Sequence, residues 1–131
     1  MRPKRDSSYG YFKALLLLGR VSNLPTVWSN CLAAWLLAGG ALVESADLQR
    51  FAWLIAGATL LFLAGMFLND VFDEQFDREF RPERPIPSGA ISAKAVWVLG
   101  IGQLLFGLGC LVWLNTVAAL CAIGLAASIL L

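Results

Sequence analysis

The sequence predicts an all-α protein whose helices form a multi-span transmembrane bundle. Its 131 residues are 59% hydrophobic and only 15% charged, whereas soluble domains are roughly 45 to 50% apolar and about 25% charged. Several apolar stretches approach the length of about 20 residues that a helix needs to span a bilayer. A single long polar stretch, residues 69–92, interrupts them. These observations make the lipid bilayer the main environment of the chain.

The apolar stretches give about four spans in a single transmembrane domain that covers residues 1–131. We expect the spans at about 22–43, 51–70, 93–114 and 116–131. Pro25 suits the first turn of the first span, where the N–H group that proline lacks has no intrahelical partner. The last apolar run has about 16 residues and no polar flank, so we expect a chain truncated at its C-terminus.

Glycines in the second and third spans predict that helix backbones approach each other closely, because glycine has no side chain to hold them apart. These glycines are Gly57, Gly65, Gly100, Gly102, Gly107 and Gly109. The pattern indicates packing rather than catalysis.

Basic residues orient the bundle. One group precedes or opens the first span, and a second group lies between the second and third spans. The first group is Arg2, Lys4, Arg5 and Arg20, and the second is Arg78, Arg81, Arg84 and Lys94. Two crossings separate the groups, so both lie on one side of the membrane. Loop 44–50 has one basic residue, Arg50. The positive-inside rule then places the N-terminus and segment 69–92 in the cytoplasm, with the chain in the inner (cytoplasmic) membrane.

Composition excludes several functions. The net charge of +1 gives no reason to expect a nucleic-acid partner. Cys31, Cys110 and Cys121 lie far apart in apolar stretches without CxxC spacing, which predicts neither disulfides nor a zinc site. The sequence has no histidine, so Ser-His and Cys-His nucleophiles and histidine metal ligands are excluded together. Any chemistry therefore depends on carboxylates, amides, basic residues and metal.

Acidic residues gather where the second apolar run ends. Asn69, Asp73 and Asp77 are spaced four residues apart, and Asp70 lies beside the first of them. On a helix, residues with this spacing share one face, where uncompensated carboxylates repel each other. A cation is therefore expected among them, and Mg²⁺ prefers such oxygen ligands. Mg²⁺ is therefore the expected cation at this face.

A solvated helix end with pairs such as Glu74 with Arg78 is the alternative interpretation of these acidic residues. Arg78, Arg81, Arg84 and the stiff turn 84–89 favour a diphosphate site instead, because guanidinium groups bind phosphate oxygens in pairs. Positive-inside anchoring explains the arginines equally well. An EF-hand is disfavoured, because its alternating ligands and closing glutamate are not present.

Three segments in this order resemble the UbiA-type intramembrane prenyltransferases. Residues 69–77, NDVFDEQFD, are similar to the family's first aspartate-rich motif, NxxxDxxxD. Residues 84–92, RPIPSGAIS, are similar to its RPxPSGxIS stretch, and residues 19–26, GRVSNLPT, resemble its first-helix entrance. The resemblance implies a fold of commonly nine spans, of which this chain supplies the N-terminal part.

By this resemblance, the protein transfers a prenyl group from an allylic prenyl diphosphate to a hydrophobic or often aromatic acceptor within the membrane, with Mg²⁺ as cofactor. The resemblance also implies that Asn69, Asp73 and Asp77 bind the metal, with Asp70 as an adjacent candidate. Asp73 and Asp77 are then catalytic through the metal. The expected substrate-binding residues are Arg20, Asn23, Arg78, Arg81 and Arg84. For two of these a structural role stays open: Arg20 as an interfacial anchor and Asn23 as a helix cap.

Two other functions remain as alternatives. A catalytically inactive fragment or membrane scaffold of the same fold is one, because the family's second aspartate-rich motif lies in the half that this sequence lacks. A CDP-alcohol phosphotransferase is the other. It is disfavoured, because its DGxxAR signature is not found around Asp70 or Asp73.

Overall fold

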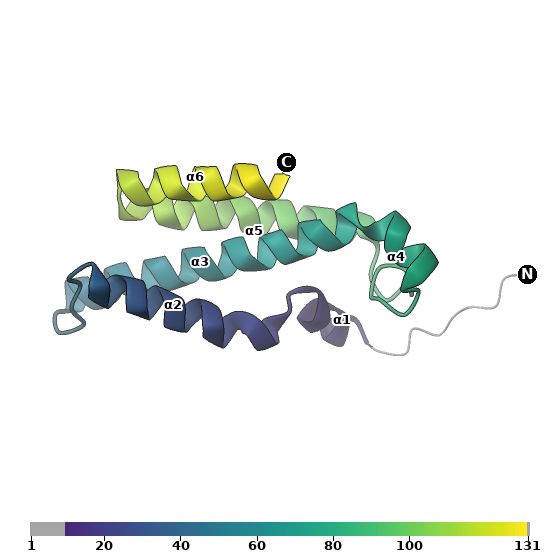
Figure 1. Cartoon of the computed structure of the whole chain (residues 1–131), viewed down its shortest axis with the longest axis horizontal. Coiled ribbons are helices and arrows are strands. Elements are labelled where there is room, and N and C mark those ends of the chain that lie inside the picture. Colours follow the sequence, from purple (N-terminus) through teal and green to yellow (C-terminus); the bar gives the residue numbers. More distant parts are fainter. Residues whose placement is uncertain (1–9, 131) are drawn as a thin grey trace, which may run out of the picture.

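The computed structural model describes residues 10–130, which form helices and connecting turns (Figure 1). The elements are α1 (Tyr11–Leu18), the 3-10 helix η1 (Val21–Asn23), α2 (Leu24–Leu37), α3 (Ser45–Phe72), α4 (Glu74–Phe80), α5 (Ala93–Leu114) and α6 (Thr116–Leu130). No strand occurs within the described range, so the all-α prediction is confirmed. The basic residues Arg2, Lys4 and Arg5 of the orientation argument, and Leu131 of the last predicted span, lie outside that range.

The long antiparallel pair α3 and α5 forms the centre of the molecule (Figure 1). The 28 residues of α3 and the 22 residues of α5 are long and apolar enough to cross a membrane. At 1.5 Å per residue, α3 is about 42 Å long, more than the hydrocarbon core of about 30 Å. Gly57, Gly100 and Gly107 bring the pair together, since a Cβ atom on Gly57, for example, would lie 2.7 Å from Leu111 Cγ. The prediction is wrong for Gly102 and Gly109, where a Cβ atom would meet nothing within 4 Å.

Helix α2 ends earlier than hydropathy predicts. Its last residue is Leu37, whereas the first span was expected to continue to residue 43. The reason is local: Gly39 takes φ +82°, and the Gly40 N–H donates to Trp35 O at 2.9 Å. The Trp35 indole then donates to Ala41 O at 3.0 Å and closes the turn. With 14 residues, α2 is shorter than the length that a perpendicular span needs.

The described residues thus contain two helices of spanning length, α3 and α5. Helix α6 has 15 residues and is also short. The spans at 22–43 and 116–131 therefore remain predictions. Helix α3 itself begins at Ser45 rather than near residue 51, because its polar first turn, with Asp47 favourable at the positive end of the helix dipole, is invisible to hydropathy.

The helices lie side by side in the order α6, α5, α3, α2, and α1, α4 and the connection 81–92 meet at one end (Figure 1). A buried cluster joins α1 and the ends of α3 and α5 to this connection: Ala14, Leu18, Phe67, Val71, Ile86, Ile91 and Val96. A second cluster packs α3, α5 and α6 together: Leu61, Ala64, Leu68, Leu104, Leu111, Ala122 and Ala126. The first cluster is the support on which the polar residues of segment 69–92 are held.

Candidate functional site

The acidic segment lies at a break between two helices. Helix α3 ends at Phe72, and Asp73 separates it from α4 with φ −84° and ψ 4°. The helical hydrogen-bond pattern nevertheless continues across the break, since Asp73 N donates to Asn69 O at 2.9 Å and Asp77 N donates to Asp73 O at 2.8 Å. The predicted four-residue progression of Asn69, Asp73 and Asp77 is therefore retained in the backbone.

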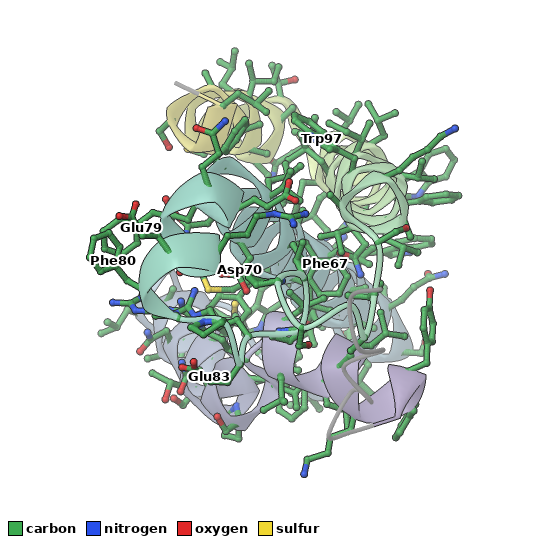
Figure 2. The ribbon with its side chains drawn as sticks, turned by 90° about the vertical axis from the view of Figure 1, so that its right-hand side faces the viewer. Phe67, Asp70, Glu79, Phe80, Glu83 and Trp97 are labelled. Atoms are coloured by element: carbon green, nitrogen blue, oxygen red, sulfur yellow. The ribbon has the colours of Figure 1, made fainter. Side chains whose placement is uncertain are left out.

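The side chains of this segment divide into an exposed pair and a buried pair. Asn69 and Asp73 are exposed, and the Asn69 amide donates to Asp73 Oδ2 at 3.2 Å. Asp70 and Asp77 are buried, with 7% and 2% of their surface exposed. Figure 2, which looks at this end of the molecule, shows Asp70 inside the ribbon, whereas Glu79 and Phe80 point outward. Burial of two carboxylates requires a compensating cation.

Arg84 supplies that cation. Its Nη1 atom lies 3.2 Å from Asp70 Oδ1 and 3.0 Å from Asp77 Oδ2, and donates a hydrogen bond to each. We call these three residues the Arg84 cluster. Two further guanidinium groups lie at longer range: Arg20 Nη2 is 4.0 Å from Asp70 Oδ1, and Arg81 Nη1 is 3.8 Å from Asp77 Oδ1. Three guanidinium groups thus surround two buried carboxylates.

The stiff turn after Arg84 holds that residue in place. The Ser88 N–H donates to Arg84 O at 2.9 Å, and the Ser88 hydroxyl donates to Pro85 O at 3.1 Å. Ile86 and Ile91 are buried in the hydrophobic cluster beneath. Proline fixes φ, and the buried isoleucines anchor the turn, so the sequence itself delivers the Arg84 side chain to the carboxylates.

The remaining predicted substrate-binding residues take separate positions. Arg78 pairs with Glu74 on the exposed side of α4, as the solvated-helix interpretation anticipates. Arg81 also lies over the Phe76 ring, with its Cζ atom 5.6 Å from the ring centroid. Asn23 is exposed and lies at the N-cap position of α2, as its alternative role anticipates, but its side chain makes no capping hydrogen bond.

Arg20 lies in the turn between α1 and η1 with φ 45°, a left-handed backbone that non-glycine residues adopt only at a cost. It borders a hollow of about 320 Å³ next to the Arg84 cluster. The hollow is lined by Leu17, Arg20, Asp70, Glu83, Arg84 and Pro85. Leu17 and Glu83 were not expected at the site, and only their nearness in sequence to Arg20 and Arg84 could have indicated them.

The donor set suits a hard cation such as Mg²⁺, because it consists of carboxylate and amide oxygens. Residues 10–130 do not gather three or more acidic, cysteine or histidine side chains around one point. One observation supports the fit: Asp77 Oδ1 is buried and accepts no hydrogen bond within the described residues. A buried carboxylate oxygen without a donor is an available ligand, and Asp70, Asp73 and Asn69 are the neighbouring oxygen donors.

A comparison with protein families decides the family of this chain, since the UbiA prenyltransferase family matches residues 24–131. The chain belongs to the UbiA prenyltransferase family. The matched range includes two of the three segments that carried the resemblance, 69–77 and 84–92, and the end of the third, and the predicted family is confirmed. Proteins of the UbiA family are integral to the membrane, in agreement with the two apolar helices of spanning length.

Similar UbiA proteins carry two different names. The chain is 34% identical to a 4-hydroxybenzoate octaprenyltransferase of Pectobacterium carotovorum over 73% of its own length and 33% of the relative's. It is also 34% identical to a digeranylgeranylglyceryl phosphate synthase of Methanoregula boonei, with the same coverage. A 4-hydroxybenzoate octaprenyltransferase of Polynucleobacter asymbioticus is 36% identical over 78% of this chain and 34% of its own.

The chain therefore spans about a third of the length of the curated relatives it matches. No solved structure matches it significantly. The family and the all-α membrane fold are thus established for this chain.

Proposed function

We propose that this chain supplies the diphosphate-binding end of a membrane enzyme that transfers a prenyl group from an allylic prenyl diphosphate to an acceptor. The observation that carries the proposal is the Arg84 cluster, in which two buried carboxylates meet an arginine at the end of an apolar helix. Such an arrangement provides oxygen ligands for a divalent cation and guanidinium donors for phosphate.

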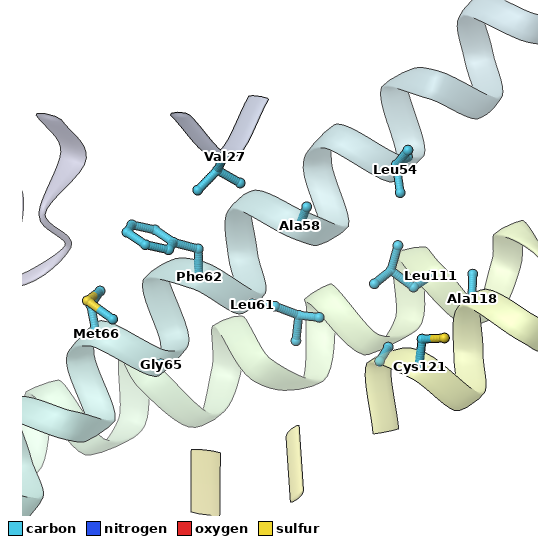
Figure 3. A pocket seen from close by; sticks show the side chains of 11 residues that line it. Val27, Leu54, Ala58, Leu61, Phe62, Gly65, Met66, Leu111, Ala118 and Cys121 are labelled. Atoms are coloured by element: carbon cyan, nitrogen blue, oxygen red, sulfur yellow. The ribbon is translucent and has the colours of Figure 1, made fainter. Parts of the chain in front are cut away.

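An apolar cavity of about 500 Å³ provides a place for the prenyl chain. Its lining comes from α2, α3, α5 and α6 (Figure 3). Met66 lies on this lining, four residues before Asp70 and on the same face of α3, so about 6 Å of helix rise separates the two. A prenyl chain in the cavity would therefore have its diphosphate next to the carboxylates.

The proposed reaction begins with cleavage of the bond between the prenyl carbon and the diphosphate oxygen. Mg²⁺, when bound by Asn69, Asp70, Asp73 and Asp77, would neutralise charge on the departing diphosphate. Arg20, Arg84 and the nearby Arg81 would donate hydrogen bonds to its oxygens, where negative charge develops. The apolar cavity would exclude water, so that the prenyl cation reacts with the acceptor rather than being hydrolysed.

The names of the relatives suggest two acceptor classes: an aromatic acid such as 4-hydroxybenzoate and a glyceryl phosphate lipid. The basic residues of segment 69–92 support the cytoplasmic side of the inner membrane as the side where diphosphate and acceptor enter. We propose no nucleic-acid partner for this chain.

The test is release of diphosphate by the full-length protein in membranes, supplied with geranyl, farnesyl or geranylgeranyl diphosphate and each acceptor class. Release should require Mg²⁺ and should be lost in Asp73→Ala, whose exposed side chain contacts Asn69 and contributes little to folding. A folded protein that releases no diphosphate from any donor would instead support an inactive fragment or membrane scaffold.

A further inference from the structure

The Arg84 guanidinium occupies the position between carboxylates that a metal ion is expected to occupy. A single atom, Nη1, contacts both Asp70 Oδ1 and Asp77 Oδ2. A divalent cation that bound these same oxygens would lie next to a positive charge, and like charges at such separation repel strongly. Metal and guanidinium therefore compete for the carboxylates instead of sharing them.

A hollow beside the carboxylates can receive the Arg84 side chain when it leaves them. Its side chain is 26% exposed, and the open side faces the hollow of about 320 Å³ that Arg20 also borders. The hollow is lined by the guanidinium groups of Arg20 and Arg84 and by the carboxylates of Asp70 and Glu83. Once a metal binds the carboxylate of Asp70, the two guanidinium groups suit an anion with several oxygens, because each donates hydrogen bonds in pairs. A diphosphate is such an anion.

The backbone of the turn does not need to move in this exchange. Ile86 and Ile91 are 5% and 3% exposed and belong to the cluster that packs on α1, α3 and α5. The Ser88 bonds to Arg84 O and Pro85 O hold the turn closed from within. The exchange would therefore require only that the Arg84 side chain turn from the carboxylates toward the hollow that it already lines.

We propose that Arg84 is a resident counter-cation of Asp70 and Asp77 that the metal displaces, and that the released guanidinium then binds the diphosphate. The inference rests on the proposed function, because it concerns the same site. Arg84 is a positioning residue for the carboxylates before the metal binds and a substrate ligand afterwards. Metal and diphosphate should then bind with positive coupling, and the coupling should disappear without the Arg84 charge.

The proposal predicts the direction in which the affinity for metal alone changes when the Arg84 charge is removed. If Arg84 competes with the metal, then removing its charge raises the affinity for metal alone. If Arg84 only holds the carboxylates in position, the same change lowers that affinity. The ion pair of Asp77 Oδ1 with Arg81 Nη1, at 3.8 Å, is the same in either case, and this buried oxygen accepts no hydrogen bond in the described part of the chain.

The experiment measures Mn²⁺ binding to the full-length protein in lipid nanodiscs, from the electron paramagnetic resonance signal of the free ion. Arg84→Gln is the main variant, because glutamine keeps an N–H donor and loses the charge. Arg50→Gln is the matched control, since it removes the same charge from an arginine near the start of α3, twenty residues before Asp70. Preformed Mn²⁺–pyrophosphate complex is titrated in parallel.

Arg84→Gln should bind Mn²⁺ alone about five- to tenfold more tightly than wild type and the Mn²⁺–pyrophosphate complex more weakly, a coupling of ordinary size for linked sites. Arg50→Gln should change metal binding less than about twofold. Equal or weaker Mn²⁺ binding by Arg84→Gln would overturn the exchange and leave the proposed function standing. Absence of Mn²⁺ binding to folded wild-type protein would remove the metal-dependent function and the exchange with it.

A second measurement covers the case in which Arg84→Gln does not fold. This measurement uses only the wild-type protein. Pyrophosphate should raise the apparent affinity of the protein for Mn²⁺ by more than the binding of Mn²⁺ to free pyrophosphate accounts for. Lack of this excess affinity in wild type would also overturn the proposal.

Discussion

The contact between α3 and α5 allows a sharp test of how the helices pack. A Cβ atom placed on Gly107 would lie 3.1 Å from Leu61 Cγ and 3.2 Å from both Gly57 O and Leu60 Cβ. These separations are tighter than van der Waals contact, and one neighbour is backbone that cannot rotate away. Gly107→Ala should therefore force the helices apart locally, at a cost of about 1–3 kcal/mol for overpacking.

Gly109 provides the matched control in the same helix, since a Cβ atom there meets nothing within 4 Å. Alanine is favoured over glycine in a helix by about 1 kcal/mol at either position. That gain is common to both variants, so the difference between Gly107→Ala and Gly109→Ala isolates the packing cost of about 1–3 kcal/mol.

The assay is equilibrium unfolding in mixed micelles with increasing dodecyl sulfate, followed by tryptophan fluorescence. Gly107→Ala should unfold at lower dodecyl sulfate than Gly109→Ala. Agreement of the two unfolding free energies within about 0.5 kcal/mol would refute the close contact between α3 and α5.

Other predictions concern the site and the helix ends. Asp77→Asn should lower the unfolding free energy by about 1–3 kcal/mol, which is less than for a fully buried ion pair because Arg84 is partly exposed. Asp73 is exposed, so Asp73→Asn should change the unfolding free energy by no more than about 0.5 kcal/mol in the same assay. Ser92→Ala, which removes the side-chain acceptor of the Ala95 N–H in the first turn of α5, should cost about 1 kcal/mol of unfolding free energy. Gly39→Ala, forced into φ +82°, should cost about 1–2 kcal/mol and expose the α2 end to proteolysis. Chelation by EDTA should abolish diphosphate release, and added Mg²⁺ should restore it; release that survives EDTA would exclude metal dependence.

The sequence was sufficient for the family, the helical class and the location of the acidic segment. Hydropathy identified α5 at 93–114, because an apolar helix with polar ends has clear limits. It failed at the end of α2, where the positive φ of Gly39 stops a run that remains apolar to residue 43. Hydropathy records the preference of side chains for lipid and does not record backbone conformation.

Within the site, spacing emphasised Asn69, Asp73 and Asp77, and Asp70 was added only as a neighbour. The structure instead joins Asp70 to Asp77 through Arg84, which lies fourteen residues after Asp70 in the chain. Helical spacing could not indicate this contact, because it depends on the turn that folds back over α1 and α3 on Ile86 and Ile91. Long-range folding of a turn leaves no periodic pattern in a sequence.

The length of α3 also has a consequence for the choice of substrate. Its apolar part begins near Phe51, and nineteen residues later, about 28 Å along the axis, the chain reaches Asp70. Since a bilayer's hydrocarbon layer is about 30 Å thick, the Arg84 cluster would lie at the level of the lipid headgroups. An amphiphile already oriented in the leaflet, with its charged head at the surface and its tail among the acyl chains, would meet this site without leaving the lipid. Short-tailed diphosphates that partition into water would arrive far less often, so the membrane itself would act as the first filter for tail length.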